Sequence, residues 1–175
     1  MSYDVTYFEV EPALVKKTLY RLRDREGFTC LQEISRTNRF VILAEKEISF
    51  LGEFTSQLIV PIELRIHDNL TIPEPGPQNS SLFVVTHIDV IPPEKETGSA
   101  MVEQMCLQSR TDEGCIACNA FSQTNRANHM TVVENWRDED TQAAHATNAS
   151  MKSFREKLAP LCGALYDERF YALIG

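Results

Sequence analysis

The sequence predicts an α+β fold in which two ferredoxin-like (split βαβ) halves pack sheet to sheet within one chain. Three observations support this prediction: a stretch near the N-terminus returns in the second half, the same order of elements surrounds both copies, and a Pro-rich segment lies between them. The chain has 175 residues, of which 43% are hydrophobic, and this suits one ordinary domain or two small ones in a soluble globular protein.

The repeat is clearest in two stretches that lie 87 residues apart, as the pair Ser35 and Ser122 shows. DREGFTCLQEISRTNR matches TDEGCIACNAFSQTNR at a Glu-Gly pair, a Ser and a Thr-Asn-Arg triplet. Each stretch leads into an apolar run that ends in Glu, at Glu45 in the first copy and at Glu134 in the second. Self-similarity at a fixed offset predicts two copies of one structural unit.

The segment between the copies, TIPEPGPQNSS, is rich in Pro, which fits neither a helix interior nor a central strand. We therefore expect residues 73–81 to link a first half, 1–72, to a second half, 82–175. A four-stranded sheet with helices on one face leaves its other face bare, and a second sheet can cover that face. Two halves on one chain meet at a smaller entropic cost than two separate subunits.

The second half begins with a strand at 82–91, which is rich in β-branched residues and ends at two prolines. Apolar residues at helical spacing predict a helix at about 94–110, and another helical stripe runs through Met151, Phe154, Leu158 and Leu161. The remaining predicted elements are strands at 115–122 and 128–136 that form a hairpin, a polar helix at 138–146, and a last strand at 165–174.

The first half follows the same order, with a shorter second helix. Its predicted elements are a strand at 5–10, a helix at 12–25, a hairpin of 28–35 with 39–45, a short helical stretch at 48–56, and a last strand that ends at Ile66. In that last strand Leu58, Val60, Ile62, Leu64 and Ile66 alternate with their neighbours, which predicts that they form its buried face. The order β-α-β-β-α-β, found twice, is the split βαβ arrangement.

Charge and composition exclude several classes of partner. The formal net charge is −8, so nucleic acid and anionic membranes would be repelled. No apolar run is long enough to span a membrane, and the N-terminus lacks the pattern of a signal peptide. We therefore expect a cytoplasmic protein whose five cysteines are reduced thiols.

Cys115 and Cys118 have the spacing of a metal or redox pair. On a strand, however, side chains three residues apart point to opposite faces, so the two thiols should diverge. The first copy has Phe28 and Leu31 at the equivalent places, and no second ligand pair of matching spacing exists. We expect buried thiols that pack, with no metal and no disulfide.

The second half resembles the antibiotic biosynthesis monooxygenase (ABM) family, in a tandem two-copy form. The resemblance is carried by FVVTHIDVIPPEK, DEGCIACNAFSQ and TVVENWRDEDTQAAHATNASMKSFREKLAPL. In the last stretch a Glu-x-Trp strand end and an acidic turn precede His145, which lies nine residues after Trp136. The resemblance implies a dimeric α+β barrel, here an intrachain pseudo-dimer, and it is compatible with a further homo-oligomer.

The family includes small enzymes that oxidise quinols or polyketides with O₂ and use no metal or flavin, and this implies no cofactor. It also includes haem-degrading members with an Asn–Trp–His set, but the corresponding Trp and His positions here hold His145 and Phe154. The resemblance thus implies a small aromatic or quinol-like substrate. Two alternatives stay open: a non-catalytic module that binds a small molecule or assists assembly, and an isomerase or lyase on the same scaffold.

Two histidines are candidate bases, since His exchanges a proton near neutral pH. His145 lies in the polar helical segment, where it is either a partly exposed helix residue or part of a pocket. His87 lies within a strand and shares a face with Asp89, so it either faces a pocket or pairs with Asp89, and pairing is slightly favoured. The first half has neither Trp nor His in residues 44–57, which predicts a degenerate copy with a packing role.

Four residues are candidates for substrate binding. Trp136 is the only Trp, and it forms either core or a pocket wall. Glu134 shares its strand face, although the repeated Glu45 favours a structural role for Glu134. Asn135 takes the other face, and Asn119 on the neighbouring strand could donate a hydrogen bond to a substrate.

Overall fold

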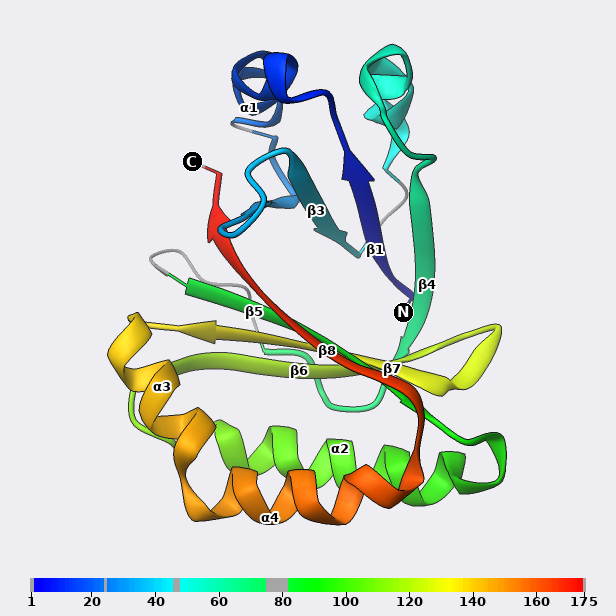
Figure 1. Ribbon diagram of the computed structural model, residues 1–175, viewed down its shortest axis with the longest axis vertical. Helices are drawn as coiled ribbons and strands as arrows, with labels where there is room; N and C mark the ends of the chain where they lie inside the picture. Colours follow the sequence, from blue (N-terminus) through cyan, green and yellow to red (C-terminus); the bar gives the residue numbers. More distant parts are fainter. Residues whose placement is uncertain (1, 24, 46–47, 75–81, 175) are drawn as a thin grey trace.

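The structure is a computed structural model that describes residues 2–23, 25–45, 48–74 and 82–174. Eight strands form a closed barrel in the order β1-β3-β2-β8-β5-β7-β6-β4, and every neighbouring pair is antiparallel (Figure 1). The first half contains β1 (Ser2–Glu9), α1 (Val15–Leu22), β2 (Thr29–Glu33), β3 (Arg39–Ala44), the 3₁₀ helix η2 (Ser49–Gln57) and β4 (Glu63–Asn69). The second half contains β5 (Leu82–Val90), α2 (Lys95–Ser109), β6 (Cys115–Gln123), β7 (Arg126–Trp136), α3 (Glu139–Thr147), α4 (Ala149–Leu158) and β8 (Cys162–Leu173).

The barrel consists of two four-stranded sheets with equivalent strand orders, β4-β1-β3-β2 and β8-β5-β7-β6. They join at two seams, where β2 pairs with β8 and β4 pairs with β6. The long β8 crosses from the second half to reach β2 (Figure 1). This arrangement confirms the predicted pseudo-dimer of ferredoxin-like halves. The predicted linker falls mostly on residues 75–81, which lie outside the described residues, so the half boundaries stay a prediction.

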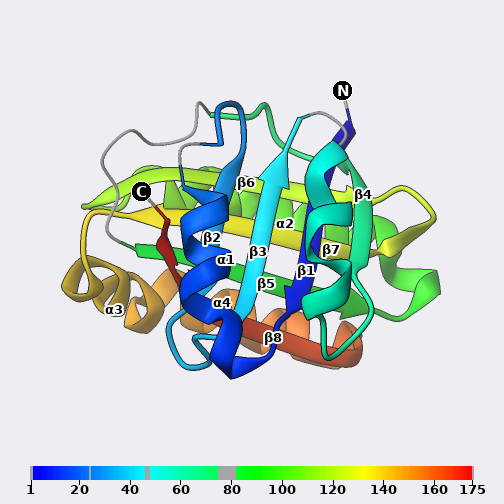
Figure 2. The same ribbon diagram turned by 90° about the horizontal axis from the view of Figure 1, so that it is seen from above.

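Helices cover the outside of the barrel, and an apolar cluster occupies part of its inside. Seen from above, α1 and η2 lie over the sheet of the first half (Figure 2), whereas α2 and α4 cover the sheet of the second half (Figure 1). The bare faces of the two sheets meet in a shared core of Val5, Leu31, Val41, Leu43, Phe83, Val85, Phe121, Val133 and Tyr171. Their sequence numbers are all odd, so odd-numbered strand residues face the interior except where a bulge shifts the pattern.

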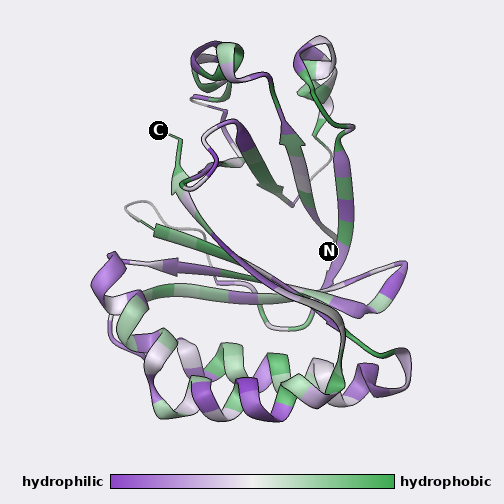
Figure 3. Ribbon diagram, in the orientation of Figure 1, coloured by the Kyte–Doolittle hydropathy of each residue, from purple (hydrophilic) through white to green (hydrophobic). Residues whose placement is uncertain are grey.

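The prediction for the last strand of the first half was wrong. β4 begins at Glu63, and Leu64 and Ile66, which were expected to be buried, are 48% and 44% exposed. β4 alternates between hydrophobic and hydrophilic residues, and this pattern by itself favours burial of the apolar face (Figure 3). Pairing with β1 decides the face, because Arg65 lies opposite the inward-facing Val5. A one-residue change of register exchanges the two faces of a strand.

The repeat is visible in the tertiary structure. In the two hairpins, however, the residues that occupy equivalent places are not separated by the constant offset of 87 residues found in the sequence. Asn38 donates from Nδ2 to the carbonyl of Val10 at 3.1 Å, and Asn128, not Asn125, donates to the carbonyl of Val90 at 2.8 Å. Each Asn side chain also donates to the carboxylate of the residue that precedes this valine. Asn38 donates to Glu9, and Asn128 donates to Asp89.

Counting along β3 and β7 from these two Asn residues places Ala44 at the position of Glu134. The pairing with the neighbouring strand agrees, since Asp4 lies opposite Ala44 and Val84 lies opposite Glu134. Glu45 therefore does not repeat Glu134, and the argument for a purely structural Glu134 falls. The matched glycines Gly27 and Gly114 both have positive φ, 78° and 80°, which supports the repeat at the preceding turn.

Among the described residues, no helix is both long enough and apolar enough to cross a membrane.

Candidate active site

Four polar side chains form a chain between the second-half sheet and its helices. The indole Nε1 of Trp136 donates to Glu134 Oε2 at 2.9 Å. Glu134 Oε1 lies 4.0 Å from His145 Nε2, and His145 Nδ1 lies 2.6 Å from Asp112 Oδ2. The rings of Trp136 and His145 are 4.6 Å apart at 36°. The sequence therefore brings together three predicted candidates and one carboxylate that was not predicted.

The local sequence explains how β7 and α3 present these groups. Glu134 and Trp136 are two residues apart on β7, so both face the helices. Asp138 caps α3 by accepting a hydrogen bond from Thr141 N at 2.8 Å, which starts the helix immediately after the strand. His145 lies in the last turn of α3 and is buried against the sheet.

Asn148 fixes the junction of α3 and α4. Its Oδ1 accepts from the backbone N of Met151 at 2.8 Å and so caps α4. Its Nδ2 donates to Asp112 Oδ2 at 3.0 Å, the same oxygen that meets His145. One residue therefore sets the helix break and orients the carboxylate beside the imidazole.

Asp112 belongs to the turn between α2 and β6. Gly114 follows in the left-handed region, and a Cβ there would lie 2.5 Å from the side chain of Thr141. The turn therefore packs closely on α3, and this contact holds Asp112 next to His145. Nothing in the TDEG stretch distinguishes Asp112 from its acidic neighbour, so sequence reasoning had no signal for it.

Opposing influences act on the buried carboxyl of Glu134. Burial raises the pKa of the Glu134 carboxyl, while His145 and the Trp136 N–H act in the opposite direction. His145 Nε2 is buried and has no hydrogen-bond partner among the described residues. A neutral imidazole that donates Nδ1–H to Asp112 keeps its lone pair on Nε2, which is the arrangement of a general base.

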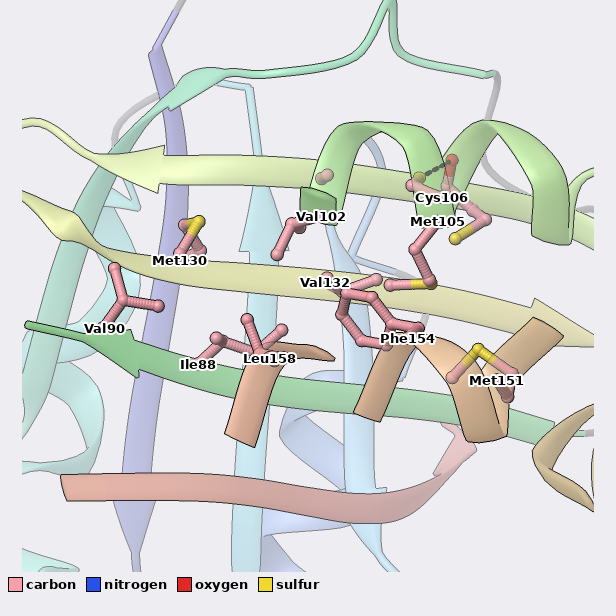
Figure 4. Close-up of a cluster of buried hydrophobic side chains, with 12 residues drawn as sticks. Ile88, Val90, Val102, Met105, Cys106, Met130, Val132, Met151, Phe154 and Leu158 are labelled. Carbon is pink, nitrogen blue, oxygen red and sulfur yellow. Dashed lines mark hydrogen bonds between the residues drawn. The ribbon is translucent and has the colours of Figure 1, made fainter. Parts of the chain in front are cut away.

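Two cavities lie beside this chain. An inner cavity of about 20 Å³ is bordered by His145 and Asp112, and an outer groove of about 360 Å³ runs between α2 and α4. Trp136 borders neither cavity and is 0% exposed, so it supports His145 from behind and forms no wall of the cavities. Sequence reasoning expected Met residues to wall the cavity but named none of them, and it assigned Met105 and Phe154 to ordinary buried helical stripes. Figure 4 shows these two side chains in the apolar cluster between the helices and β7.

The other predicted residues lie elsewhere. Asn135 faces the barrel interior and is buried, and neither atom of its amide has a hydrogen-bond partner among the described residues. Asn119 lies near a seam, where its Oδ1 accepts from Glu74 N and from Arg110. Neither residue shares a cavity with His145, so no single ligand could touch all of the predicted candidates.

His87 also faces the barrel interior, on the opposite side of the sheet from His145. Its Nδ1 lies 3.1 Å from Arg65 Nη1 and 3.2 Å from Thr131 Oγ1, so the expected pairing with Asp89 was wrong. Asp89 instead pairs with His129 at 3.5 Å. Burial and the nearby Arg65 lower the pKa of His87 to about 3, and its Nδ1 lone pair accepts from Arg65. His87 is therefore a poor base.

Cys115 and Cys118 correct the prediction of divergent thiols. A register shift between Cys115 and Ala117 places Cys115 opposite Trp136 and Cys118 opposite Glu134, which share one face. Both thiols therefore face the helices. All five cysteines are free, and no group of three or more His, Cys, Asp or Glu residues in the described parts of the chain has the geometry of a metal site.

Comparison with known proteins gives one family match. Residues 81–157 match the profile of the family described as "Antibiotic biosynthesis monooxygenase". The match includes Asp112, Glu134, Trp136 and His145. No curated protein sequence matches the chain significantly.

Solved structures resemble the whole chain. A candidate monooxygenase from Fusobacterium nucleatum subsp. nucleatum is 13% identical, with a TM-score of 0.83 over 99% of this chain and 92% of that one. An anthrone oxidase-like protein is 12% identical, with a TM-score of 0.74 over 99% and 91%. A candidate antibiotic biosynthesis monooxygenase from Nitrosomonas europaea is 14% identical and covers 52% of this chain with 96% of its own, at a TM-score of 0.50. At these identities the likeness establishes the fold alone.

Proposed function

Because residues 81–157 match the model of the family described as "Antibiotic biosynthesis monooxygenase", we propose that the protein oxidises a small phenolic, quinol or polyketide-like substrate with O₂, with His145 as the base. One observation carries the proposal. A buried imidazole is held at Nδ1 by Asp112, while its Nε2 is left without a hydrogen-bond partner. A histidine in the core of a purely structural domain would be expected to have both nitrogens satisfied.

The first step is proton removal. His145 Nε2 takes the phenolic proton of the substrate, and Asp112 stabilises the imidazolium that forms. Glu134, at 4.0 Å from Nε2, is a second carboxylate to which this proton can pass. The Trp136 N–H holds Glu134 in place from the other side.

The oxygen chemistry then follows from the electron-rich anion. The anion gives one electron to O₂, and the substrate radical and superoxide combine to form a C–O bond. Protonation of the resulting peroxide by the imidazolium and cleavage of its O–O bond release water and leave a carbonyl. In sum, SH₂ and O₂ give SO and H₂O. The protein contributes the base, the position of the substrate and an apolar surrounding that excludes water.

The test is oxygen uptake with a panel of quinols and anthrone-like phenols. We expect His145→Ala to lower turnover by about 10²-fold or more, which is the scale of a lost general base. His129→Ala is the matched control, because it also removes a histidine that contacts an aspartate in the same half, and His129 borders neither cavity. Equal rates for wild type and His145→Ala would remove His145 as the base.

A non-catalytic binding module is the second candidate, and it is favoured by the contrast between the outer groove of about 360 Å³ and the much smaller cavity beside the base. A cavity of about 20 Å³ has no room for an aromatic ring. Absence of uptake by the wild type on every phenol, together with a small molecule that co-purifies and is found by mass spectrometry, would favour this role. Turnover of a phenol or ketone without O₂ would instead indicate an isomerase or lyase.

A further inference from the structure

The inner cavity and the outer groove are separated by a few side chains that line both. Of the residues around His145, four also border the groove between α2 and α4: Met105, Gln108, Ser150 and Phe154. Two of these are apolar and two are polar, and each pair takes one residue from α2 and one from α4. The four side chains therefore form a partition between the groove and the base.

The polar pair closes the partition with one hydrogen bond. Gln108 Nε2 donates to Ser150 Oγ at 2.7 Å, and this bond links the last turn of α2 to the first turn of α4. The bond is exposed to solvent, so its net contribution to stability is about 1 kcal/mol or less. A bond this weak can open and close without unfolding either helix.

The apolar pair forms the inner side of the partition. Met105 and Phe154 belong to the same buried cluster and lie next to each other between the helices and β7 (Figure 4). Met has three rotatable bonds and adapts its shape at little cost. A ring that passes between the helices can therefore displace Met105 while Phe154 packs against its face.

We propose that the substrate reaches His145 from the α2–α4 groove, and that Gln108 and Ser150 decide which molecules pass. This inference rests on the proposed role of His145. Met101, Met105 and Phe154 supply the apolar surface of the groove, neutral polar side chains form most of the rest, and Lys157 is its one charged lining residue. The groove therefore suits a flat, fused-ring phenol with a polar or acidic group at the end that remains near Lys157, and it disfavours a cation.

Trp136 offers a readout that does not depend on activity. It is the only Trp, it is 0% exposed, and its ring lies 4.6 Å from that of His145. Its fluorescence should be quenched by acrylamide only when acrylamide passes the partition. We expect Gln108→Ala to raise the quenching rate constant about fivefold, since about 1 kcal/mol of closure is lost, and Ser150→Ala to act in the same direction.

Gln104→Ala is the matched control, because Gln104 lies one turn earlier on α2 and borders the outer groove only. The proposal predicts unchanged quenching in this variant. Equal quenching in wild type and in both partition variants, or an equal rise in Gln104→Ala, would overturn it.

Activity separates this inference from the proposed function. If a phenol is oxidised, Gln108→Ala should lower KM several-fold for a three-ring anthrone and leave KM nearly unchanged for a one-ring quinol. A loss of turnover in His145→Ala without any change in quenching in the partition variants would keep the function and reject the partition. Increased quenching in a protein that oxidises no phenol would keep the partition and reject the function.

Discussion

The two halves of the barrel have the same architecture, but the layers between sheet and helices differ in the side chains that fill them. In the first half the layer is a group of phenylalanines, in which Phe8 stacks on Phe40 at 5.3 Å and meets Phe54 at 5.4 Å. Phe50 joins them at 6.3 Å from Phe54. In the second half the same layer holds Met and Cys side chains around a buried Glu–His pair.

The strand position shared by Ala44 and Glu134 shows the difference most directly. Ala44 packs in the apolar cluster of the first half, whereas Glu134 receives the Trp136 N–H and faces His145. A buried carboxylate is stable only where partners surround it. One copy of the unit thus stabilises the barrel, and the other accommodates polar groups that a single small domain would tolerate less well.

The largest expected effect comes from moving the carboxylate to the other half. Ala44→Glu would bury a charge in an apolar cluster and opposite the acidic Asp4, and we expect a loss of about 5 kcal/mol of unfolding free energy. Glu134→Ala should cost less, about 1–3 kcal/mol, because it leaves one indole N–H unsatisfied. Urea denaturation of both variants measures the difference. Similar losses in the two halves would contradict the contrast between the layers.

Cavity-creating substitutions should also separate the two layers. Phe54 is fully buried among aromatic rings, so Phe54→Ala should cost about 4 kcal/mol. Phe154 already borders a cavity and a groove, so Phe154→Ala should cost about 2 kcal/mol. Denaturation midpoints give both losses of unfolding free energy, provided that the variants have the same m-value as the wild type. A greater loss for Phe154→Ala would mean that the second-half layer is packed as tightly as the first.

Burial of His87 should make the stability of the protein depend on pH in acid. The folded pKa of His87 is about 3, below the value of free His, so the unfolded chain binds the proton first as pH falls. As pH falls from about 6.5 to about 3, protonation of this histidine in the unfolded chain should lower the unfolding free energy by about 1.4 kcal/mol per pH unit. His87→Gln should flatten this part of the profile. The control is His129→Gln, and equal flattening in both variants would contradict the assignment.

The smallest effect concerns Glu134 and has the opposite dependence on pH. Burial raises the pKa of Glu134 in the folded protein above its value in the unfolded chain. The contribution of this carboxyl to the unfolding free energy is therefore fully present at low pH and is lost as pH rises through the folded pKa. Relative to wild type, Glu134→Gln should therefore gain stability as pH rises through the folded pKa of Glu134. Glu156→Gln, an exposed change on α4, is the control. A gain that is equal in both variants, or absent from Glu134→Gln, would show that burial does not dominate at this position.

The sequence by itself determined the order of the elements, the two-copy organisation and part of the candidate site. These features rest on local patterns: the period of a strand puts Glu134 and Trp136 on one face, and polar helical spacing brings His145 back over that face. The equivalence of the two hairpins needed the structure, because insertions between the copies hide it from a constant offset.

Contacts between distant segments decided the rest. The alternation of β4 favours burial of Leu64, but pairing with β1 turned Arg65 inward and Leu64 outward. A bulge in β6 placed Cys115 and Cys118 on the same face, against the rule for a regular strand. Asp112 met His145 only because a turn packs on α3. Register, bulges and turn packing depend on which strands and helices become neighbours, and no local window of sequence contains that information.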